Sequence, residues 1–413
     1  MLLAAEFDKS MDDDSISVTR AFVVLSISLF ASMLGLGIVS PLMSIFAEDL
    51  GATGVWLGAI FSGYFLARAF IMPFIGRLSD QWGKRKIFLI LGLATLGFTS
   101  IGYILSQDVI QLMLARFLQG LGSGIVLPIS LAYIGDITPD GKEGSYIGYI
   151  NMARMAGWGS GPLIGGILME WSGFEMPFLI MGALAFLALA IVLILLPEKE
   201  VQEQSRTQPR PTISYRTILN IPTIRGVVVF RFITAIGTGN LFSFFPLLAD
   251  SLGIPPGDVG ILLSSRILIM SFLQGPFGIL ADRYDKTRLI LLSGIGSAIL
   301  MLLVPSTHTF WELLTLGIFI GLNWAMLIPA STGLAAEYGR EHGMASVMST
   351  INVGMSIGMV IGPLTSGVIM DLFNIQAIFY YGGFMAILGS LLFFILVFWR
   401  FRATKHSSTP ILS

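Results

Sequence analysis

Five arginines lie inside long apolar stretches of the chain, where a positive charge is costly. They are Arg68, Arg116, Arg154, Arg231 and Arg266. A guanidinium in hydrocarbon costs at least ~2.5 kcal/mol on insertion scales, so each must face a cavity or a polar partner. Carboxylates are missing from the same stretches, because all 25 acidic residues lie in tails, loops or helix ends. One interpretation is an arginine-lined cavity that prefers an anionic or zwitterionic substrate.

The alternative interpretation is structural, with each arginine bonded to helix-terminal carbonyls or to polar neighbours such as asparagines. Both interpretations stay open at this point. Six residues are therefore candidates for lining a substrate cavity or for coupling, namely Arg116, Arg154, Arg266, Arg68, Asn240 and Asn323.

Composition excludes several other kinds of chemistry. The chain has no cysteine and only three histidines, so we expect no metal site and no cofactor. It offers no nucleophile–base pair and no phosphate-binding loop, so an enzyme is not expected. The net charge of −1 gives no electrostatic case for nucleic acid.

The elements that carry these residues are predicted to be membrane-spanning helices. Of the 413 residues, 54% are hydrophobic and 12% are charged, about half the charge of a soluble protein. Apolar runs of about 18 or more residues indicate spanning helices. We find twelve, at 21–44, 55–76, 87–105, 109–133, 145–169, 177–196, 226–248, 257–280, 289–305, 309–334, 344–370 and 375–399.

Lysines and arginines predict the orientation of these helices. The basic residues outside the spans lie in the two tails and in the loops that follow even-numbered helices, and the opposite loops hold none. Because basic loops stay in the cytoplasm, both termini are predicted to be cytoplasmic in a multi-pass cell membrane protein. We expect an N-tail at 1–20, a six-helix bundle at 21–196, a linker at 197–224, a second bundle at 225–400 and a C-tail at 401–413.

The two predicted bundles repeat each other. A shift of 202 residues aligns Gly76 and Asp80 with Gly278 and Asp282, and a shift of 201 aligns Pro162 with Pro363. Apolar composition would not place aspartates and prolines in register. The fold class predicted is all-α and integral to the membrane, with twelve helices in two pseudo-symmetric bundles around a central cavity, an arrangement that permits alternating access.

Three motifs resemble those of the major facilitator superfamily. Residues 76–86, GRLSDQWGKRK, are similar to its signature loop between helices 2 and 3. Residues 116–122, RFLQGLG, resemble its membrane-arginine motif in helix 4. Residues 157–166, GWGSGPLIGG, are similar to the helix 5 motif of its drug/proton antiporters. The resemblance covers essentially the whole chain.

The signature loop implies a conformational latch on the cytoplasmic side. Asp80 would engage the positive end of helix 11, which begins near Met344, while the cavity is open to the outside. Gly76 would let the helices approach, and Asp136 would pair with the basic run. The latch residues expected are Gly76, Asp80, Gly83, Arg85, Asp136 and Asp282.

The helix 5 motif implies a hinge that prevents leakage. Its glycines recur every four residues and its proline frees a backbone carbonyl, so the helix can both pack tightly and bend. Plain packing would explain the glycines equally well. The hinge residues expected are Gly157, Gly161, Pro162, Gly165 and Gly166.

The function that this resemblance implies is secondary-active transport by alternating access. We expect a monomer that exports small amphipathic compounds in exchange for protons. The family's antiporters commonly carry an acid in helix 1, but residues 35–41 read GLGIVSP here. The alternative is therefore a uniporter or exchanger of an anionic metabolite, or a lipid flippase on the same fold. Collapse of the pH gradient would stop the proton-driven exporter and would leave the exchanger active.

Overall fold

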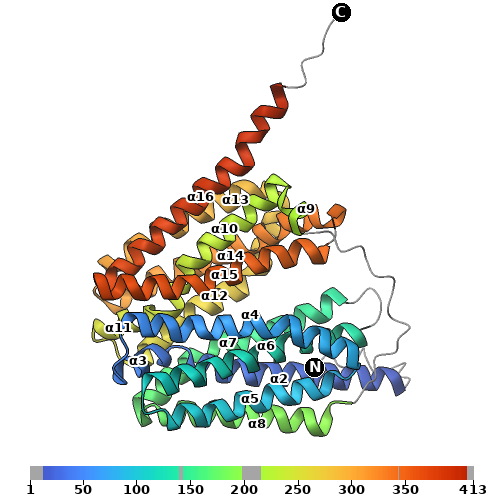
Figure 1. Cartoon of the computed structure of the whole chain (residues 1–413), viewed down its shortest axis with the longest axis vertical. Coiled ribbons are helices and arrows are strands. Elements are labelled where there is room, and N and C mark those ends of the chain that lie inside the picture. Colours follow the sequence, from blue (N-terminus) through green and yellow to red (C-terminus); the bar gives the residue numbers. More distant parts are fainter. Residues whose placement is uncertain (1–12, 139–142, 198–214, 343, 407–413) are drawn as a thin grey trace, which may run out of the picture.

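The computed structural model describes residues 13–138, 143–197, 215–342 and 344–406, which form helices and no strand. The first group of helices follows the chain from its N-terminus. It contains α2 (Asp13–Val39), α3 (Leu42–Asp49), α4 (Gly54–Trp82), α5 (Arg85–Leu105), α6 (Val109–Ile137), α7 (Glu143–Ser172) and α8 (Glu175–Leu195). Figure 1 shows this group as one layer in blue to green.

A second group lies beside the first and repeats its order. It contains α9 (Tyr215–Leu219), α10 (Pro222–Ser243), α11 (Phe245–Ser251), α12 (Pro256–Arg283), α13 (Lys286–Leu303), the 3-10 turn η2 (Val304–Ser306), α14 (Phe310–His342), α15 (Met344–Leu372) and α16 (Ile375–His406). Most of the predicted linker, residues 198–214, lies outside the described residues, as do the ends of both tails. The all-α, two-bundle membrane fold is confirmed.

Two of the predicted spans are each broken into a long and a short helix. The first breaks between Val39 and Leu42, where Pro41 precedes α3. The seventh breaks at Phe244, directly before α11, in which Pro246 stands in the first turn. A proline has no N–H to donate within a helix, so the chain restarts at a new angle. Continuous runs at 21–44 and 226–248 were expected, and these breaks correct them.

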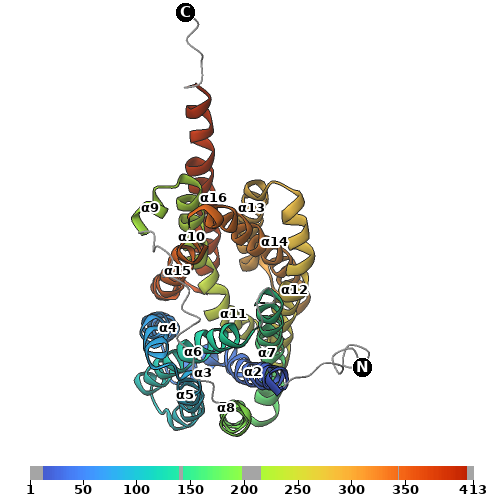
Figure 2. The same cartoon turned by 90° about the vertical axis from the view of Figure 1, so that its right-hand side faces the viewer.

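Within the part of the chain that the structure describes, eleven helices are long and apolar enough to cross a membrane, and α7 is not among them. The predicted span 145–169 is helical, as part of α7, but it is rich in glycine and carries Asn151 and Arg154. Figure 2 shows α7 between α2 and α12, and it contacts both of them. A helix that faces protein on two sides needs less apolar surface than one that faces lipid.

The two groups are joined by apolar packing at one end only. One core cluster combines Val39 and Met43 of the first group with Leu241, Phe244 and Leu248 of the second. The other two clusters lie within the first group and within the second group. Figure 1 shows the groups close together near α3 and α11 and diverging toward the opposite end. We name the end at α3 and α11 the sealed end, and the end that carries Arg85 and Lys286 the basic end.

Candidate functional site

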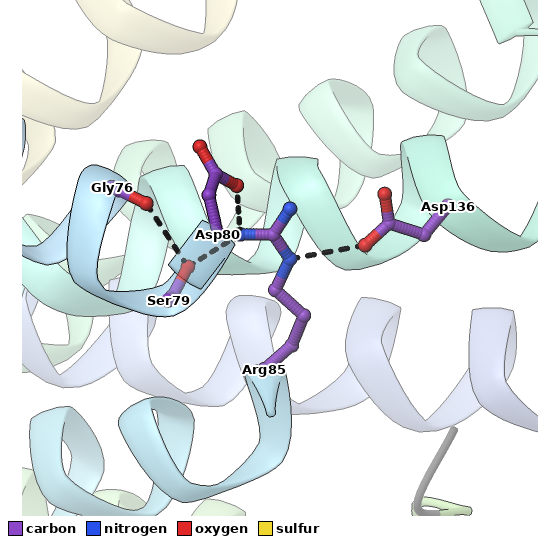
Figure 3. Close-up of polar contacts among 5 residues, drawn as sticks. All are labelled: Gly76, Ser79, Asp80, Arg85 and Asp136. Atoms are coloured by element: carbon purple, nitrogen blue, oxygen red, sulfur yellow. Dashed lines mark hydrogen bonds and ion pairs between the residues drawn. The ribbon is translucent and has the colours of Figure 1, made fainter. Parts of the chain in front are cut away.

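The signature loop forms an ion-pair network around a buried arginine at the basic end. Arg85, the first residue of α5, is 7% exposed. Its Nη1 lies 2.6 Å from Oδ1 of Asp80, and its Nε donates to Oδ2 of Asp136 at 3.0 Å (Figure 3). Nη1 also donates to the hydroxyl of Ser79. The network therefore ties the ends of α4, α5 and α6 together within the first group of helices.

Two glycines of the signature loop have different surroundings. Gly83 ends α4 in the left-handed region, at φ 66°, where a side chain would be strained, and its N–H donates to the Ser79 carbonyl. Gly76 has open space where a Cβ would stand, so it makes no close helix contact in this conformation.

The second group repeats the ion pair. Lys286 opens α13, and its Nζ lies 2.8 Å from Oε1 of Glu337 in α14. A shift of 201 residues relates this pair to Arg85 and Asp136, so Arg85, rather than its neighbour Lys84, is the structural counterpart of Lys286. Asp282 lies exposed near the end of α12 and forms no ion pair with another described residue.

The glycine motif of α7 packs against two helices. A Cβ at Gly161 would lie 2.5 Å from the backbone of Gly37, and one at Gly165 would lie 2.1 Å from the carbonyl oxygen of Ile38. Gly157 meets α2 in the same way, so one side of α7 touches the backbone of that helix. On another side of α7, a Cβ at Gly166 would lie 2.2 Å from the carbonyl oxygen of Pro256 in α12.

A seam between α4 and α15 closes the sealed end. A Cβ at Gly58 would lie 2.3 Å from the carbonyl oxygen of Pro363. One turn earlier, the carboxylate of Asp371 accepts the N–H groups of Gly54 at 2.6 Å and Val55 at 2.9 Å. These donors form the positive end of α4, so the carboxylate caps a helix of the other group.

The same seam is repeated between α7 and α12. A Cβ at Gly260 would lie 2.4 Å from the carbonyl oxygen of Pro162. Here Glu170, which a shift of 201 residues relates to Asp371, places a carboxylate oxygen 2.5 Å from the Cβ position of Gly257 at the start of α12. The two carboxylates therefore stand at equivalent places on both seams, each against the first turn of a helix in the other group.

Two serines add hydrogen bonds across the seams. The hydroxyl of Ser62 donates to the carbonyl of Val360 at 2.6 Å. Its counterpart Ser264 accepts the N–H of Leu163 at 2.9 Å. Leu163 directly follows Pro162 in α7, and Val360 lies within one turn before Pro363 in α15, so both partners are close to a proline that interrupts the helical hydrogen-bond ladder.

Further along the same helices, the seams end. Gly76 of α4, Gly148 of α7 and Gly275 of α12 have no heavy atom of another described segment within 4 Å of a Cβ position. Gly63 also has open space at its own Cβ position, although its neighbour Ser62 still bonds across the seam. Contacts between the groups are therefore tight at the sealed end and absent at the Cβ positions of Gly76, Gly148 and Gly275, nearer the basic end.

Three acidic residues gather where α3 meets α11. Burial raises the pKa of Glu48, and the charges of Asp250 and Asp49 raise it further. Burial also raises the pKa of Asp250, with a contribution from the charge of Asp49. Glu48 and Asp250 are related by the shift of 202 residues, so like charges face each other across the two groups when this end is closed.

In the first group, Arg116 of α6 is held by protein atoms. Its Nη1 donates to Oε1 of Gln119, which also accepts the hydroxyl of Tyr103 at 2.7 Å. The guanidinium carbon lies 4.7 Å from the ring centre of Tyr64 and 5.2 Å from that of Phe61. This arginine has both a polar partner and two aromatic faces.

In the second group, Arg266 of α12 has aromatic neighbours but no hydrogen-bond partner for Nη1 or Nη2 among the described residues. It is 6% exposed, and its guanidinium carbon lies 5.3 Å from the ring centre of Phe242 and 5.6 Å from that of Phe245. Arg266 lines a cleft of about 290 Å³ together with Thr238, Leu241, Phe242, Ile267, Met270, Ile320, Gly321 and Trp324.

A second cleft, of about 390 Å³, adjoins this one between α10, α13, α14 and α16. Asn323 lines it, with its Nδ2 already donating to the carbonyl of Ser293 and the hydroxyl of Ser297. Asn240 lines neither cleft, because it is fully buried and bonded to Ile378 and Ser366. The structure therefore gives Asn240 a packing position inside the second group.

The other two candidate arginines lie half-buried in the first group. Nε of Arg154 donates to Oδ1 of Asn151 at 3.3 Å, one turn earlier on α7. Arg68 of α4 lies near enough to Arg154 for their charges to repel.

The seam residues Asp371, Glu170, Ser62 and Ser264 were not predicted from the sequence, although the 201-residue repeat relates the first two.

The chain resembles known transporters along nearly its whole length. The profile of the Major Facilitator Superfamily matches residues 25–232 and 227–411. An uncharacterised MFS-type transporter of Methanocaldococcus jannaschii is 28% identical over 367 residues, covering 88% of this chain and 95% of the relative. The quinolone resistance protein NorA of Staphylococcus aureus is 27% identical over 370 residues, with 88% and 93% covered. Multidrug resistance protein 2 of Bacillus subtilis is also 27% identical, over 378 residues, with 89% and 93% covered.

Solved structures share the fold. A bacterial homologue of the lysosomal transporter Spinster, in an inward-facing state, gives a TM-score of 0.76 at 14% identity and covers 94% of this chain and 97% of its own. The human organic anion transporter MFSD10 gives 0.65 at 17% identity, with 91% and 99% covered. The family profile and the sequence relatives define a membrane transporter of small molecules, not an enzyme. The chain belongs to the major facilitator superfamily.

Proposed function

We propose that the chain is a monomeric exporter of small amphipathic compounds that works by alternating access and is driven by protons. The supporting observation is its one-sided closure, with both seams tight at the sealed end and open space at the Cβ positions of Gly76 and Gly148, nearer the basic end. A pathway closed at one end is half of an alternating-access cycle. The likeness to NorA and Multidrug resistance protein 2 supports efflux, and the motif at 157–166 supports proton coupling.

The basic residues orient this cycle in the proposal. The basic end carries Arg85 and Lys286, so the positive-inside rule assigns it, with both chain termini, to the cytoplasm. The conformation described here is then open to the cytoplasm. In the opposite state Asp80 would leave Arg85 and cap the start of α15, as Asp371 caps α4 at the sealed end. The bundles that move are those at 21–196 and 225–400.

The test is transport by purified protein in liposomes under a pH jump. Ethidium and 2-naphthalenesulfonate, which carry opposite charges and cross bilayers poorly, serve as probes. We expect accumulation of at least one of them against its gradient, and complete loss when nigericin collapses the pH difference. Protein-free liposomes are the control. Accumulation that ignores nigericin would refute proton coupling.

A second candidate is a uniporter or exchanger of an anionic metabolite, and Arg266 is the observation that favours it. Its guanidinium is buried in a cleft without a polar partner, and the described spans provide no carboxylate to pair with it. The liposome experiment separates the two functions, because an exchanger would move 2-naphthalenesulfonate down its own gradient whatever the pH difference.

Arg116 tests the transport cycle itself. Replacing it with alanine removes the cation held by Gln119 and the rings of Phe61 and Tyr64. We expect Arg116→Ala to abolish probe transport while expression stays normal, and Arg116→Lys to restore part of it. Wild-type turnover in Arg116→Ala would remove this arginine from the cycle.

A further inference from the structure

Arg266 is the least satisfied buried cation that the structure describes. Both terminal nitrogens of its guanidinium are buried without a hydrogen-bond partner, whereas Nε is the one nitrogen that is both buried and unpartnered in Arg116 and in Arg231. A guanidinium carries five N–H donors in a planar fork that matches a carboxylate or sulfonate. The two unpartnered nitrogens are therefore the side of the fork that would hold a two-oxygen anion.

The surroundings of Arg266 keep its charge in place without neutralising it. Phe242 and Phe245 lie within 5.6 Å of the guanidinium carbon, and their ring faces stabilise a cation. Ring faces cannot accept the N–H bonds as an oxygen does, and no carboxylate of the described chain forms an ion pair with Arg266. An unpaired buried charge is costly, so this arrangement favours an anion that enters from outside the protein.

The cleft beside the guanidinium has the lining of a ligand site, with apolar and aromatic side chains around one charged group. A second cleft adjoins it. Leu241, Ile320 and Trp324 line both clefts. A ligand whose anionic group meets Arg266 would thus lay an apolar, aromatic body along this shared wall.

The contrast with the first group shows that a free guanidinium is not general in this chain. There Gln119 accepts from Arg116, and neither cleft involves that arginine. The position equivalent to Arg266 by the 202-residue shift is Tyr64, one of the rings that stack on Arg116. Among the described residues, a guanidinium with both terminal nitrogens buried and unpartnered therefore occurs in the second group alone, where it breaks the twofold symmetry of the fold.

We propose that Arg266 and the shared wall of the two clefts form the binding site for an organic monoanion with an aromatic body, held through its carboxylate or sulfonate group. The proposal rests on the proposed transport function and specifies its substrate class. It also places substrate recognition in the second group of helices, so the first group would move relative to the bound substrate during the transport cycle.

Binding by purified protein in detergent, measured by equilibrium dialysis without any pH gradient, tests this site. The probes are 2-naphthoate, 2-naphthalenesulfonate, the neutral 2-naphthamide and the cationic 2-naphthylmethylammonium. We expect the wild type to bind the two anions roughly tenfold to hundredfold more tightly than the amide, since hydrogen bonds to charged groups are the strong ones. The ratio between naphthoate and naphthalenesulfonate tells which anionic group fits better.

Arg266→Gln should reduce the preference for naphthoate over the amide to within about twofold, and Arg266→Lys should keep an intermediate preference. Arg231→Gln is the matched control, because Arg231 lies in the same group with a buried unpartnered Nε but lines neither cleft. It should leave the preference unchanged. A tenfold preference that survives in Arg266→Gln, or a wild type that binds the cation or the amide best, would overturn the proposal.

A thermal-shift measurement guards against a variant that is merely misfolded. Naphthoate should raise the melting temperature of the wild type but not that of Arg266→Gln, while the amide shifts both alike. A purely structural arginine would instead lower the melting temperature when replaced and leave the ligand shifts equal. Because binding needs no gradient, anion selectivity without proton-driven flux would refute the proposed export alone, and flux without anion selectivity would refute this site alone.

Discussion

The two ends of the molecule use the same chemical device in different ways. At the sealed end, the carboxylate of Asp371 reaches across to the other group and caps the first turn of α4. At the basic end, the carboxylate of Asp80 pairs with Arg85 of its own group. The comparison indicates that a cross-group cap marks the closed end, and that an ion pair with Arg85 holds Asp80 in the same conformation.

The twofold repeat extends this comparison. The α4–α15 and α7–α12 seams both use a glycine against a proline carbonyl, a serine against backbone and a carboxylate against a helix start. Because they are equivalent, one rocking motion would open both. Each variant below either breaks one end or tests whether the other end responds.

The largest effect is expected from Gly58→Leu. Its Cβ would stand 2.3 Å from the Pro363 carbonyl, which is backbone and cannot move aside without parting the seam. We expect the sealed end to open and transport to fall more than tenfold. Gly63→Leu, on the same helix but beside open space, is the matched control and should keep activity. Normal transport by Gly58→Leu would show that this seam need not close.

Asp371→Asn should have the next largest effect. Asparagine keeps a hydrogen-bond acceptor but loses the negative charge that is favoured at a helix start. We expect the free energy of the closed sealed end, relative to the open one, to rise by about 1–2 kcal/mol, which is roughly a fivefold to thirtyfold shift in their populations. Because the chain lacks cysteine, single labels can be placed cleanly at the exposed positions Gln107 and His308. Electron–electron distance measurements should then show a longer separation at the sealed end.

Glu312→Gln is the control for Asp371→Asn. Its carboxylate also accepts two backbone N–H groups, from His308 and Thr309, but within one group of helices. Labels at Gln107 and Ser306 should give unchanged distances in this variant, since no cross-group contact is lost. An equal opening in both variants would mean that capping charge alone, and not the bridge, sets the balance.

Asp80→Asn tests the opposite end and should have a smaller effect. In the conformation described here Asp80 is paired with Arg85 of its own group, and Arg85 keeps Asp136 as a second carboxylate partner, so we expect this state to change little. The state in which the basic end closes should lose up to about 1 kcal/mol of stabilisation. Labels at Trp82 and Tyr284, both exposed, would report a reduced short-distance population. A longer distance at the sealed end in Asp80→Asn would contradict the assignment of Asp371 to the sealed end and of Asp80 to the basic end.

The smallest effect expected is a pH dependence of the sealed end. Closure raises the pKa of Glu48 and of Asp250, through burial and through the charges around them, including Asp49. A proton therefore binds the closed state more tightly than an open one, so closure is favoured at low pH. It weakens as the pH rises from the ordinary carboxyl range through the raised pKa values.

The Glu48→Gln, Asp250→Asn double variant should flatten this profile and keep the sealed end closed at higher pH. The same pair of labels, at Gln107 and His308, measures it. A profile that stays steep in the double variant would assign the pH dependence to another group.

The sequence was sufficient for the helices and their family, because long apolar runs and three motifs are local patterns. It was not sufficient for the seams. Asp371 lies 317 residues from Gly54, and only the packed fold shows that the two touch. Likewise, the sequence placed Arg116 and Arg266 in equal standing, whereas the structure satisfies one with Gln119 and leaves the other without a polar partner.

Some of the missed features had a signal in the sequence. The repeat that aligned Pro162 with Pro363 also aligns Glu170 with Asp371, and two acids at matching helix ends could have indicated a shared role. The breaks at Pro41 and Phe244 were hidden because the flanking residues are as apolar as the helices themselves.

The closure at the sealed end depends on main-chain atoms facing glycines, as at Gly58 and Gly260. A barrier of that kind is indifferent to which side chains line the interior. Met270 and Asn323, which line the clefts and lie outside the core cluster that joins the two groups, could therefore change during evolution, and with them the transported compound, while the seams stay unaltered. Among transporters with this fold, the transported compound would therefore vary far faster than the structure of the seams that close the pathway.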